Sequence, residues 1–153
     1  MINQFQKHQE ENKDLGVRAR VSKEEMMMQI AELVATRSTC KRLHVGAVLT
    51  DEKMFNISAF GFNGNYSGGP NTCDSDEIGN CGCTHSEIGC LVKGKGSILF
   101  ITDSPCLACT KVIINAGVKK VYYRNEYRKT EGLDLLKKMN IETIQLCDQS
   151  PLF

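Results

Sequence analysis

Ten residues near the middle of the chain, CGCTHSEIGC (81–90), bring together side chains that bind metals and move protons. His85 and Glu87 stand two positions apart, and a proline with a Cys-x-x-Cys pair, Cys106 and Cys109, follows after a short apolar segment. Imidazole and thiolate are the usual protein ligands of zinc, and three of them leave a fourth position for water, as catalytic sites do. The sequence therefore predicts a zinc site made by His85, Cys106 and Cys109.

Glu87 favours a catalytic site over a structural one. Zinc lowers the pKa of bound water to about 7, and a carboxylate that is not a ligand can carry the released proton. The signature His-x-Glu followed by Pro-Cys-x-x-Cys is typical of zinc-dependent nucleobase deaminases. Two alternatives remain open: a redox Cys-x-x-Cys pair, which does not need the upstream His-x-Glu, and a structural zinc site, which would leave Glu87 unexplained.

The composition limits the remaining functions. The chain has 153 residues, 41% hydrophobic residues and a net charge of +1, which suits one globular domain and offers no overall attraction for nucleic acid or an anionic membrane. The first 20 residues are polar, and no apolar run is long enough to span a bilayer. We expect a cytoplasmic protein, in which eight cysteines indicate metal binding rather than disulfides.

The elements that must position these residues alternate between strand and helix after residue 45. Residues 1–21 are predicted to form a polar arm and residues 22–153 a single domain. Ser22 and Glu25 are predicted to form the capping box of a first helix. Strands are predicted at 45–50, 54–61, 97–102, 119–126 and 141–146, and further helices at 85–93, 104–115 and 130–139. This order predicts a three-layer α/β/α sandwich.

The predicted topology also brings the ligands together. The helices that begin at His85 and near Ser104 flank a single buried strand, so their N-termini are expected at the same edge of the sheet. Ser104 is predicted as the N-cap of the second of these helices, with Pro105 at its first position and Gly117 at its end. A glycine- and asparagine-rich stretch, residues 61–83, shows no periodicity, and loops of this length are usually functional or fixed by a ligand.

Three segments carry a family resemblance: THSEIGCL, TDSPCLACTKVIINAGVKKVYY and VGAVLT with the later GFNG. They resemble the deoxycytidylate (dCMP) deaminase family of the cytidine deaminase fold, over about residues 22–146. The resemblance implies a five-stranded mixed sheet, a homo-oligomer that is commonly a hexamer, and hydrolytic deamination of dCMP to dUMP. It also implies that zinc-activated water attacks C4 of the ring while Glu87 delivers protons to N3 and to the departing ammonia.

The same resemblance assigns substrate contacts. Asn63 would bind the deoxyribose, the Ser86 backbone N–H the pyrimidine carbonyl, and the Ser104 carbonyl the leaving amine. The family motif His-Ala-Glu-x-Asn-Ala is altered here, because Ser86 replaces the first alanine and Gly89 the asparagine. A backbone contact tolerates the serine, whereas a glycine inside a helix costs about 0.5–1 kcal/mol relative to alanine. Gly89 could permit the close approach of a neighbouring side chain or subunit.

Some viral members of the family carry a second, structural zinc. The segments STCKRLHVGAV, GGPNTCD and CGCTH match the places of its ligands, which implies a site made by Cys40, Cys73, Cys81 and Cys83. Because Cys-x-Cys is a tight spacing, His44 or water could replace Cys81 or Cys83, and all four could instead be free small apolar residues. The two other cysteines, Cys90 and Cys147, are expected to be packing residues.

A substrate phosphate requires cationic or hydroxyl donors. Arg124 and Tyr127 are the predicted phosphate contacts, with Arg128 and Arg42 as further candidates, although each arginine could simply be a solvated charge. In the family, triphosphate effectors bind near the glycine-rich loop, which makes dCTP and dTTP candidate effectors.

Three functions remain open at this stage. The first is deamination of dCMP, of dCTP or of a modified dCMP. The second is deamination of a base in tRNA or single-stranded DNA, for which a basic groove with stacking aromatic side chains is expected; this chain is nearly neutral and has no tryptophan. The third is a catalytically silent zinc protein, against which Glu87 argues.

Overall fold

A five-stranded mixed sheet forms the centre of the computed structural model, which describes residues 20–147. Its strands are β1 (Gly46–Thr50), β2 (Ile57–Phe62), β3 (Ile98–Asp103), β4 (Lys120–Asn125) and β5 (Glu142–Gln145). They lie in the order β2-β1-β3-β4-β5, with β1 antiparallel to both neighbours and β3, β4 and β5 mutually parallel. The predicted strands and the mixed sheet are confirmed.

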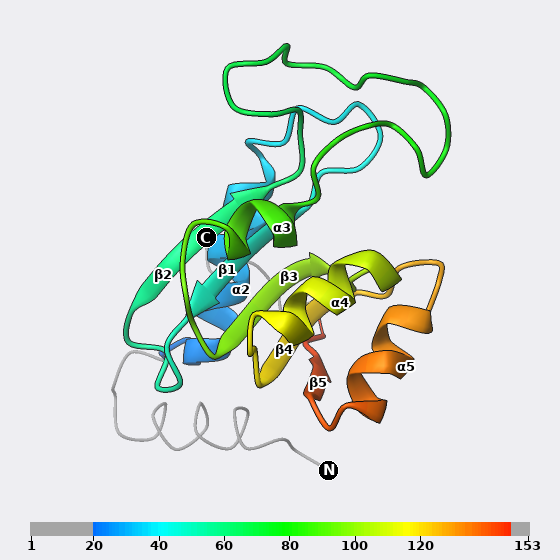
Figure 1. Ribbon diagram of the computed structural model, residues 1–153. Helices are drawn as coiled ribbons and strands as arrows, with labels where there is room; N and C mark the ends of the chain where they lie inside the picture. The colour runs from blue at the N-terminus through cyan, green and yellow to red at the C-terminus, as the bar shows by residue number, and fades with distance from the viewer. Residues whose placement is uncertain (1–19, 148–153) are drawn as a thin grey trace.

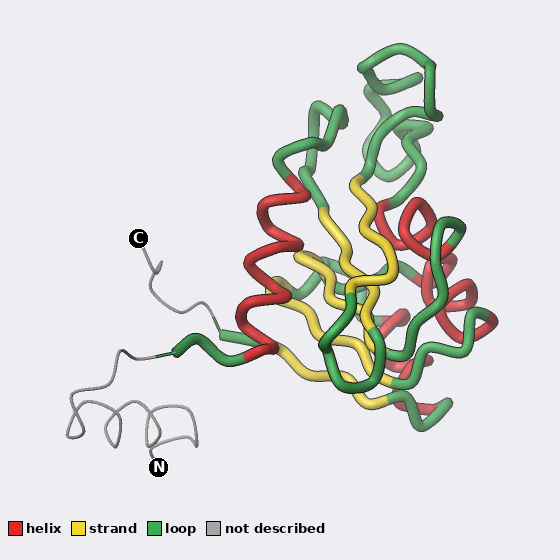
Figure 2. The backbone as a smooth tube through the Cα atoms, turned by 90° about the vertical axis from the view of Figure 1, so that its left-hand side faces the viewer, coloured by secondary structure: helices red, strands yellow, loops and turns green. Residues whose placement is uncertain are grey.

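Helices cover both faces of this sheet (Figures 1 and 2). They are α2 (Lys23–Ala35), α3 (Ser86–Leu91), α4 (Leu107–Asn115) and α5 (Glu131–Lys138). On one face, Met28 of α2 packs with Phe100 and Tyr122 of the sheet. On the other face, α3, α4 and α5 pack against alternate residues of the same strands, such as Ile101 and Tyr123. The predicted three-layer α/β/α sandwich is therefore confirmed.

Helix α2 begins where predicted, but only one of the two hydrogen bonds of the predicted capping box is present. Ser22 is its N-cap, and the Ser22 hydroxyl accepts a hydrogen bond from the Glu25 N–H at 3.1 Å. The prediction that Glu25 makes the reciprocal bond of the capping box is wrong, because the Glu25 carboxylate turns into the protein and binds Arg124 at 2.7 Å. The helix ends at Ala35, so Cys40 lies in the following loop.

Helix α4 begins two residues later than predicted. Its N-cap is Cys106 instead of Ser104. The reason is that Ser104 is tied to the end of β4: its N–H donates to the Asn125 carbonyl at 2.8 Å, and its hydroxyl accepts from the Tyr127 N–H at 2.8 Å. The predicted end is confirmed, since Gly117 follows the helix with a left-handed φ of 76°.

The ends of the chain add little to this picture. The predicted arm, residues 1–21, lies almost entirely outside the described residues. Among residues 20–147, no helix has the length and apolarity that crossing a bilayer requires. The long segment between β2 and α3 projects beyond the sheet next to the start of α3 (Figure 1).

Candidate active site

Two helix beginnings meet at one edge of the sheet and bring the predicted ligands together. His85 is the N-cap of α3, Cys106 is the N-cap of α4, and Cys109 lies in the first turn of α4. The His85 Nδ1 atom is 3.5 Å from the Cys106 sulfur and 3.3 Å from the Cys109 sulfur. All three ligand atoms lie within 4.8 Å of one another. The arrangement is compact enough for one metal ion.

The distances and charges of this cluster fit zinc. Zinc bonds of about 2.0 Å to nitrogen and 2.3 Å to sulfur at a tetrahedral centre place those two atoms roughly 3.5 Å apart. Hydrogen bonds with Cys109 and His85 lower the pKa of the Cys106 thiol to about 3. The same contact with Cys106, together with burial, raises the pKa of Cys109, so one thiol of the pair is held as the thiolate, the form that binds metal.

Glu87 lies beside the cluster without belonging to it. Its side chain is buried, and burial raises the pKa of its carboxyl above the ordinary value for glutamate. The buried Ser86 hydroxyl donates to Glu87 Oε2 at 3.0 Å. A carboxyl group held in this way can accept and return a proton close to the metal ligands. The family resemblance assigns a contact to the Ser86 backbone alone, so this contact of the hydroxyl is an addition.

A cavity of about 700 Å³ opens in front of these groups. The predicted contacts Asn63, Ser86, Ser104 and Tyr127 all line it, together with His85, Glu87 and Cys106. Sequence reasoning missed several further lining residues, among them the charged Asp103, Glu126 and Lys129. Two of these positions offered a signal, because Asp103 ends a buried strand and Lys129 follows the predicted phosphate contacts.

Asn63 is held in the cavity wall by the preceding loop. Its Oδ1 accepts from the Val45 N–H at 2.8 Å and from the Ser38 hydroxyl at 2.7 Å, and its Nδ2 donates to the Leu43 carbonyl at 2.7 Å. An amide group has two N–H donors, so one of them is left for a ligand.

Arg124 does not line the cavity, and its predicted role in phosphate binding is wrong. Its guanidinium is buried among the carboxylates of Glu25 and Glu32, each at 2.7 Å. Side chains alternate along a strand, and Arg124 lies on the same face as Tyr122, which packs with α2. The cavity lies on the opposite face of the sheet, beside α3 and α4. Arg42 and Arg128 do line it.

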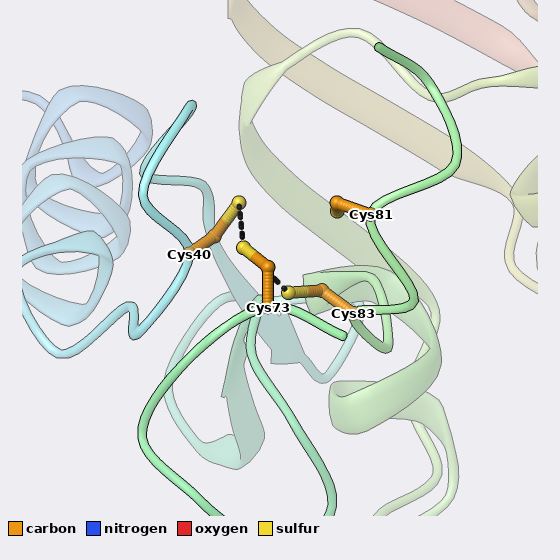
Figure 3. A group of neighbouring side chains, drawn as sticks. All are labelled: Cys40, Cys73, Cys81 and Cys83. Carbon is orange, nitrogen blue, oxygen red and sulfur yellow. Dashed lines mark hydrogen bonds between the residues drawn. The ribbon is translucent and has the colours of Figure 1, made fainter. Parts of the chain in front are cut away.

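Four other cysteines form a second cluster, shown in Figure 3. The Cys73 sulfur is 3.7 Å from that of Cys40 and 3.6 Å from that of Cys83, and with Cys81 all four sulfurs lie within 4.8 Å of one another. Four sulfurs about 2.3 Å from a tetrahedral zinc would be roughly 3.8 Å apart. The four side chains therefore fit a closed zinc site.

The thiols of this cluster differ in how readily they ionise. Burial opposes ionisation of Cys40, but backbone N–H groups of Leu43 and Arg42 lower its pKa to about 7. Burial and hydrogen bonds with Cys73 and Cys81 raise the pKa of Cys83. His44 is exposed and is not among the clustered residues, so the alternative in which it replaces a cysteine is not supported.

Comparisons with known proteins agree with this geometry. The family model of the cytidine and deoxycytidylate deaminase zinc-binding region matches residues 21–125. The crystal structure of the dCMP deaminase from the cyanophage S-TIM5 in complex with dCMP and dUMP is 41% identical, with a TM-score of 0.73, and the match covers 80% of this chain and 96% of that one.

Two relatives are longer than this chain. ComE operon protein 2 of Bacillus subtilis is 35% identical over 120 residues, which is 71% of this chain and 62% of that protein. The deoxycytidylate deaminase of Saccharomyces cerevisiae is 29% identical over 153 residues, which is 89% of this chain and 48% of that protein. The chain thus spans less than two thirds of either relative.

The family match covers more than half of the chain and includes every residue of both clusters. This chain therefore belongs to the cytidine and deoxycytidylate deaminase zinc-binding family.

Proposed function

We propose that this chain catalyses the hydrolytic deamination of dCMP to dUMP and ammonia, in pyrimidine deoxynucleotide metabolism. One observation carries the proposal: the ligand cluster of His85, Cys106 and Cys109 and the buried Glu87 share one cavity. The cyanophage dCMP deaminase, which matches over almost its whole length, supports the choice of substrate.

The metal ligands and Glu87 have different roles in the proposed reaction. Zinc at His85, Cys106 and Cys109 would supply a water molecule that is acidic enough to ionise near pH 7. Glu87 would carry one proton of the attacking water to N3 as the oxygen adds to C4, and would then carry the second proton of that water to the amine, which leaves as ammonia when the C4–N bond breaks.

Backbone and amide groups of the cavity wall are the proposed contacts of the base and the sugar. We assign the Ser86 N–H, one of the unpaired donors at the start of α3, to the pyrimidine carbonyl. The Ser104 carbonyl accepts from the leaving amine, and the remaining N–H of the Asn63 amide reaches a deoxyribose hydroxyl. Tyr127, Arg42, Arg128 and Lys129 line the cavity and are the candidate phosphate contacts.

A panel of substrates tests the reaction. Purified protein is incubated with dCMP, dCTP, CMP, deoxycytidine and a cytosine-containing oligonucleotide, and ammonia release is measured. We expect the highest kcat/KM for dCMP. Release from the oligonucleotide alone would contradict the proposal and favour a polynucleotide deaminase, and release from no substrate would favour a silent zinc protein.

Glu87→Gln tests the assigned chemistry in the same assay. The variant keeps the shape of the side chain but cannot transfer protons, so turnover should fall by at least about 100-fold. Zinc content, measured by elemental analysis, should stay unchanged, because Glu87 is not a ligand in this assignment. If zinc is lost together with activity, Glu87 acts as a ligand. Glu131→Gln, an exposed substitution in α5, is the control.

We assign Cys40, Cys73, Cys81 and Cys83 to a second, structural zinc. The expected stoichiometry is about two zinc ions per chain. Cys73→Ser should lose one of them, whereas Cys147→Ser, which changes an exposed cysteine outside the cluster, should lose none. A wild-type stoichiometry of one zinc would refute the second site.

Three further expectations accompany this function. A homo-oligomer, with six copies as the family resemblance implies, is consistent with exposed apolar side chains on the edge strand β2. Regulation by dCTP or dTTP stays a prediction that activity assays with each triphosphate can test. An intracellular location is consistent with eight cysteines, all of which are free thiols in the structure.

A further inference from the structure

The second cluster is part of the wall of the catalytic cavity. Cys40, Cys81 and Cys83 line the same cavity as His85 and Glu87. A closed four-cysteine site that only stabilised the fold would have no need to face the substrate. The segments that these sulfurs hold together therefore border the substrate cavity.

The cluster joins loop segments that have almost no regular secondary structure. Cys40 follows α2, and the other three cysteines lie between β2 and α3. The Lys41 N–H donates to the Cys73 sulfur at 3.4 Å, and the Asp74 N–H donates to the Cys81 carbonyl at 2.9 Å. These contacts and the sulfur cluster hold the segment 73–83 against the loop that follows α2.

A cation of the cavity is fastened to this segment. Arg42, two residues after Cys40, donates from Nη1 to the Glu77 carbonyl at 2.8 Å. The acceptor is neutral, so this bond orients the guanidinium without cancelling its charge. The Asn80 N–H donates to the same carbonyl at 3.2 Å, which fixes the turn that presents it.

A second cation reaches the same segment from the loop that follows β4. Arg128 lies against Gly79, where an added Cβ would be 3.4 Å from the Arg128 Nη2 atom. Tyr127 and Lys129 flank Arg128 in the lining of the cavity. Two guanidinium groups from different loops thus contact residues 77–79 and line the same cavity, and guanidinium groups are well suited to bind the oxygens of a phosphate dianion.

The catalytic residues depend much less on this segment. A backbone bridge between Gly64 and Thr84, with N–H to carbonyl distances of 3.1 and 2.8 Å, closes the base of the segment directly before His85. Beyond it, α3 and α4 pack on the core of the sheet. Loosening the four-cysteine cluster can therefore displace Arg42 and Arg128 while the catalytic ligands stay in place.

We propose that the four-cysteine cluster positions the residues that recognise the substrate phosphate, by holding segment 73–83 so that Arg42 and Arg128 converge on it. The inference rests on the proposed function, and it deepens that function by making the cluster a determinant of selectivity for nucleotides over nucleosides. Cys73 is then a positioning residue, and Arg42 is a binding residue that depends on it.

Equilibrium binding of the product separates this role from simple stabilisation. Calorimetry measures the dissociation constants of dUMP and deoxyuridine for the wild-type protein, Cys73→Ser and Cys147→Ser. We expect Cys73→Ser to weaken dUMP binding by at least about ten-fold and deoxyuridine binding by no more than about two-fold. With saturating dCMP, its kcat should stay within about three-fold of the wild-type value. Cys147→Ser should change neither constant.

Arg42→Gln provides a second test that keeps the cluster intact. It should weaken dUMP binding by at least about ten-fold in the wild-type background and have little further effect in Cys73→Ser, because the cluster and Arg42 then act as one unit. If Arg42→Gln leaves the ratio of the two dissociation constants unchanged, the proposal is wrong, whether or not Cys73→Ser folds. Equal weakening of both ligands by Cys73→Ser would also overturn it.

The behaviour of the wild-type protein distinguishes a failure of the proposed deaminase function from a failure of the proposed role of the four-cysteine cluster. Turnover of dCMP without the predicted changes in binding would refute the role of the cluster and leave the proposed function in place. A wild-type protein that neither deaminates dCMP nor prefers dUMP over deoxyuridine would refute both.

Discussion

Arg124 shows how burial decides what a charged residue can do. Its guanidinium contacts Glu25 and Glu32 of α2 and also donates to the Cys147 carbonyl at 2.9 Å, so its donors serve the protein itself. A buried charge is tolerated only when partners replace the water it has lost. Arg124 therefore fastens α2 and the end of β5 to the central sheet.

Replacing Arg124 by methionine should destabilise the protein without affecting the substrate. The carboxylate of Glu25 would be left buried and unpaired, and removal of one partner of such a pair lowers the free energy of unfolding by about 3–5 kcal/mol. Urea denaturation measures this loss. The KM for dCMP, measured well below the unfolding temperature, should stay within about two-fold, since the change removes no cavity contact.

Lys120 in the same strand offers a matched control. Its ion pair with Glu142, 2.8 Å long, is partly exposed. Pairs of this kind contribute about 0–1 kcal/mol, so Lys120→Met should have little effect on stability. A large rise in KM for Arg124→Met, with unchanged stability, would restore a role for Arg124 in phosphate binding.

At the scale of elements, α3 lies unusually close to the sheet. A Cβ added at Gly61 of β2 would be 2.3 Å from the Ser86 carbonyl oxygen and 2.5 Å from the Cys90 nitrogen. Both are backbone atoms that cannot move aside alone. The absence of a side chain at Gly61 thus lets α3, which carries Glu87 and follows His85, approach its position over β2.

Gly61→Ala should push α3 away from the sheet. Such overpacking costs about 1–3 kcal/mol or more, and we expect a lower melting temperature together with weaker zinc retention and a lower kcat. Calorimetric melting and elemental analysis measure these effects. Full zinc content and wild-type kcat in this variant would show that the position of α3 matters less than the geometry suggests.

Gly89→Ala is the corresponding control within α3. Here an added Cβ would meet only the Phe62 carbonyl oxygen, at an ordinary contact distance of 3.8 Å. The prediction that Gly89 permits the close approach of a neighbouring side chain is therefore wrong within the described residues. Alanine is favoured over glycine inside a helix by about 0.5–1 kcal/mol. The variant should be slightly more stable than the wild-type protein, and a loss of stability would indicate that a second subunit contacts this position.

At the scale of the whole molecule, one edge of the sheet is apolar and exposed. Phe60 of β2 is 52% exposed and pairs with Val48, whose side chain faces α2. An irregularity between Leu49 and Thr50 shifts the register, so that Ile57, 42% exposed, pairs with Thr50 on the same face. Unpaired strand edges with apolar side chains readily associate.

Phe60→Lys tests whether this edge contributes to the proposed homo-oligomer. A charge there should shift the sedimenting species toward smaller assemblies, because the charge would have to be buried at an interface. Lys93→Ala, an exposed change in the loop after α3, should not. An unchanged sedimentation coefficient for Phe60→Lys would exclude this edge as an interface.

Removal of metal should affect the whole molecule as well. The residues between β2 and α3 form no helix or strand, so bound zinc would contribute directly to their order. Treatment with a strong chelator should lower the melting temperature and abolish turnover, and added zinc should restore both. Thermal unfolding with and without chelator measures this effect. A chelated, zinc-free protein with an unchanged melting temperature would contradict it.

Local spacing and element order were enough to predict the cluster of His85, Cys106 and Cys109 and most elements. Cys106 and Cys109 are three residues apart at the start of a helix, so their proximity follows from helix geometry, and the strand between the two helices predicts His85 beside them. The strands were recognisable because apolar runs between turn residues reflect burial. The alternation of strand and helix then restricted the chain to a few layered arrangements.

Only the tertiary structure decided the rest, because partners distant in sequence compete for the same side chain. Glu25 leaves its expected capping contact for Arg124, 99 residues away, since a buried guanidinium requires a carboxylate. Ser104 is taken by the end of β4, which moves the start of α4 to Cys106. The place of the four cysteines in the cavity wall depends in the same way on three-dimensional packing, which residue spacing does not encode.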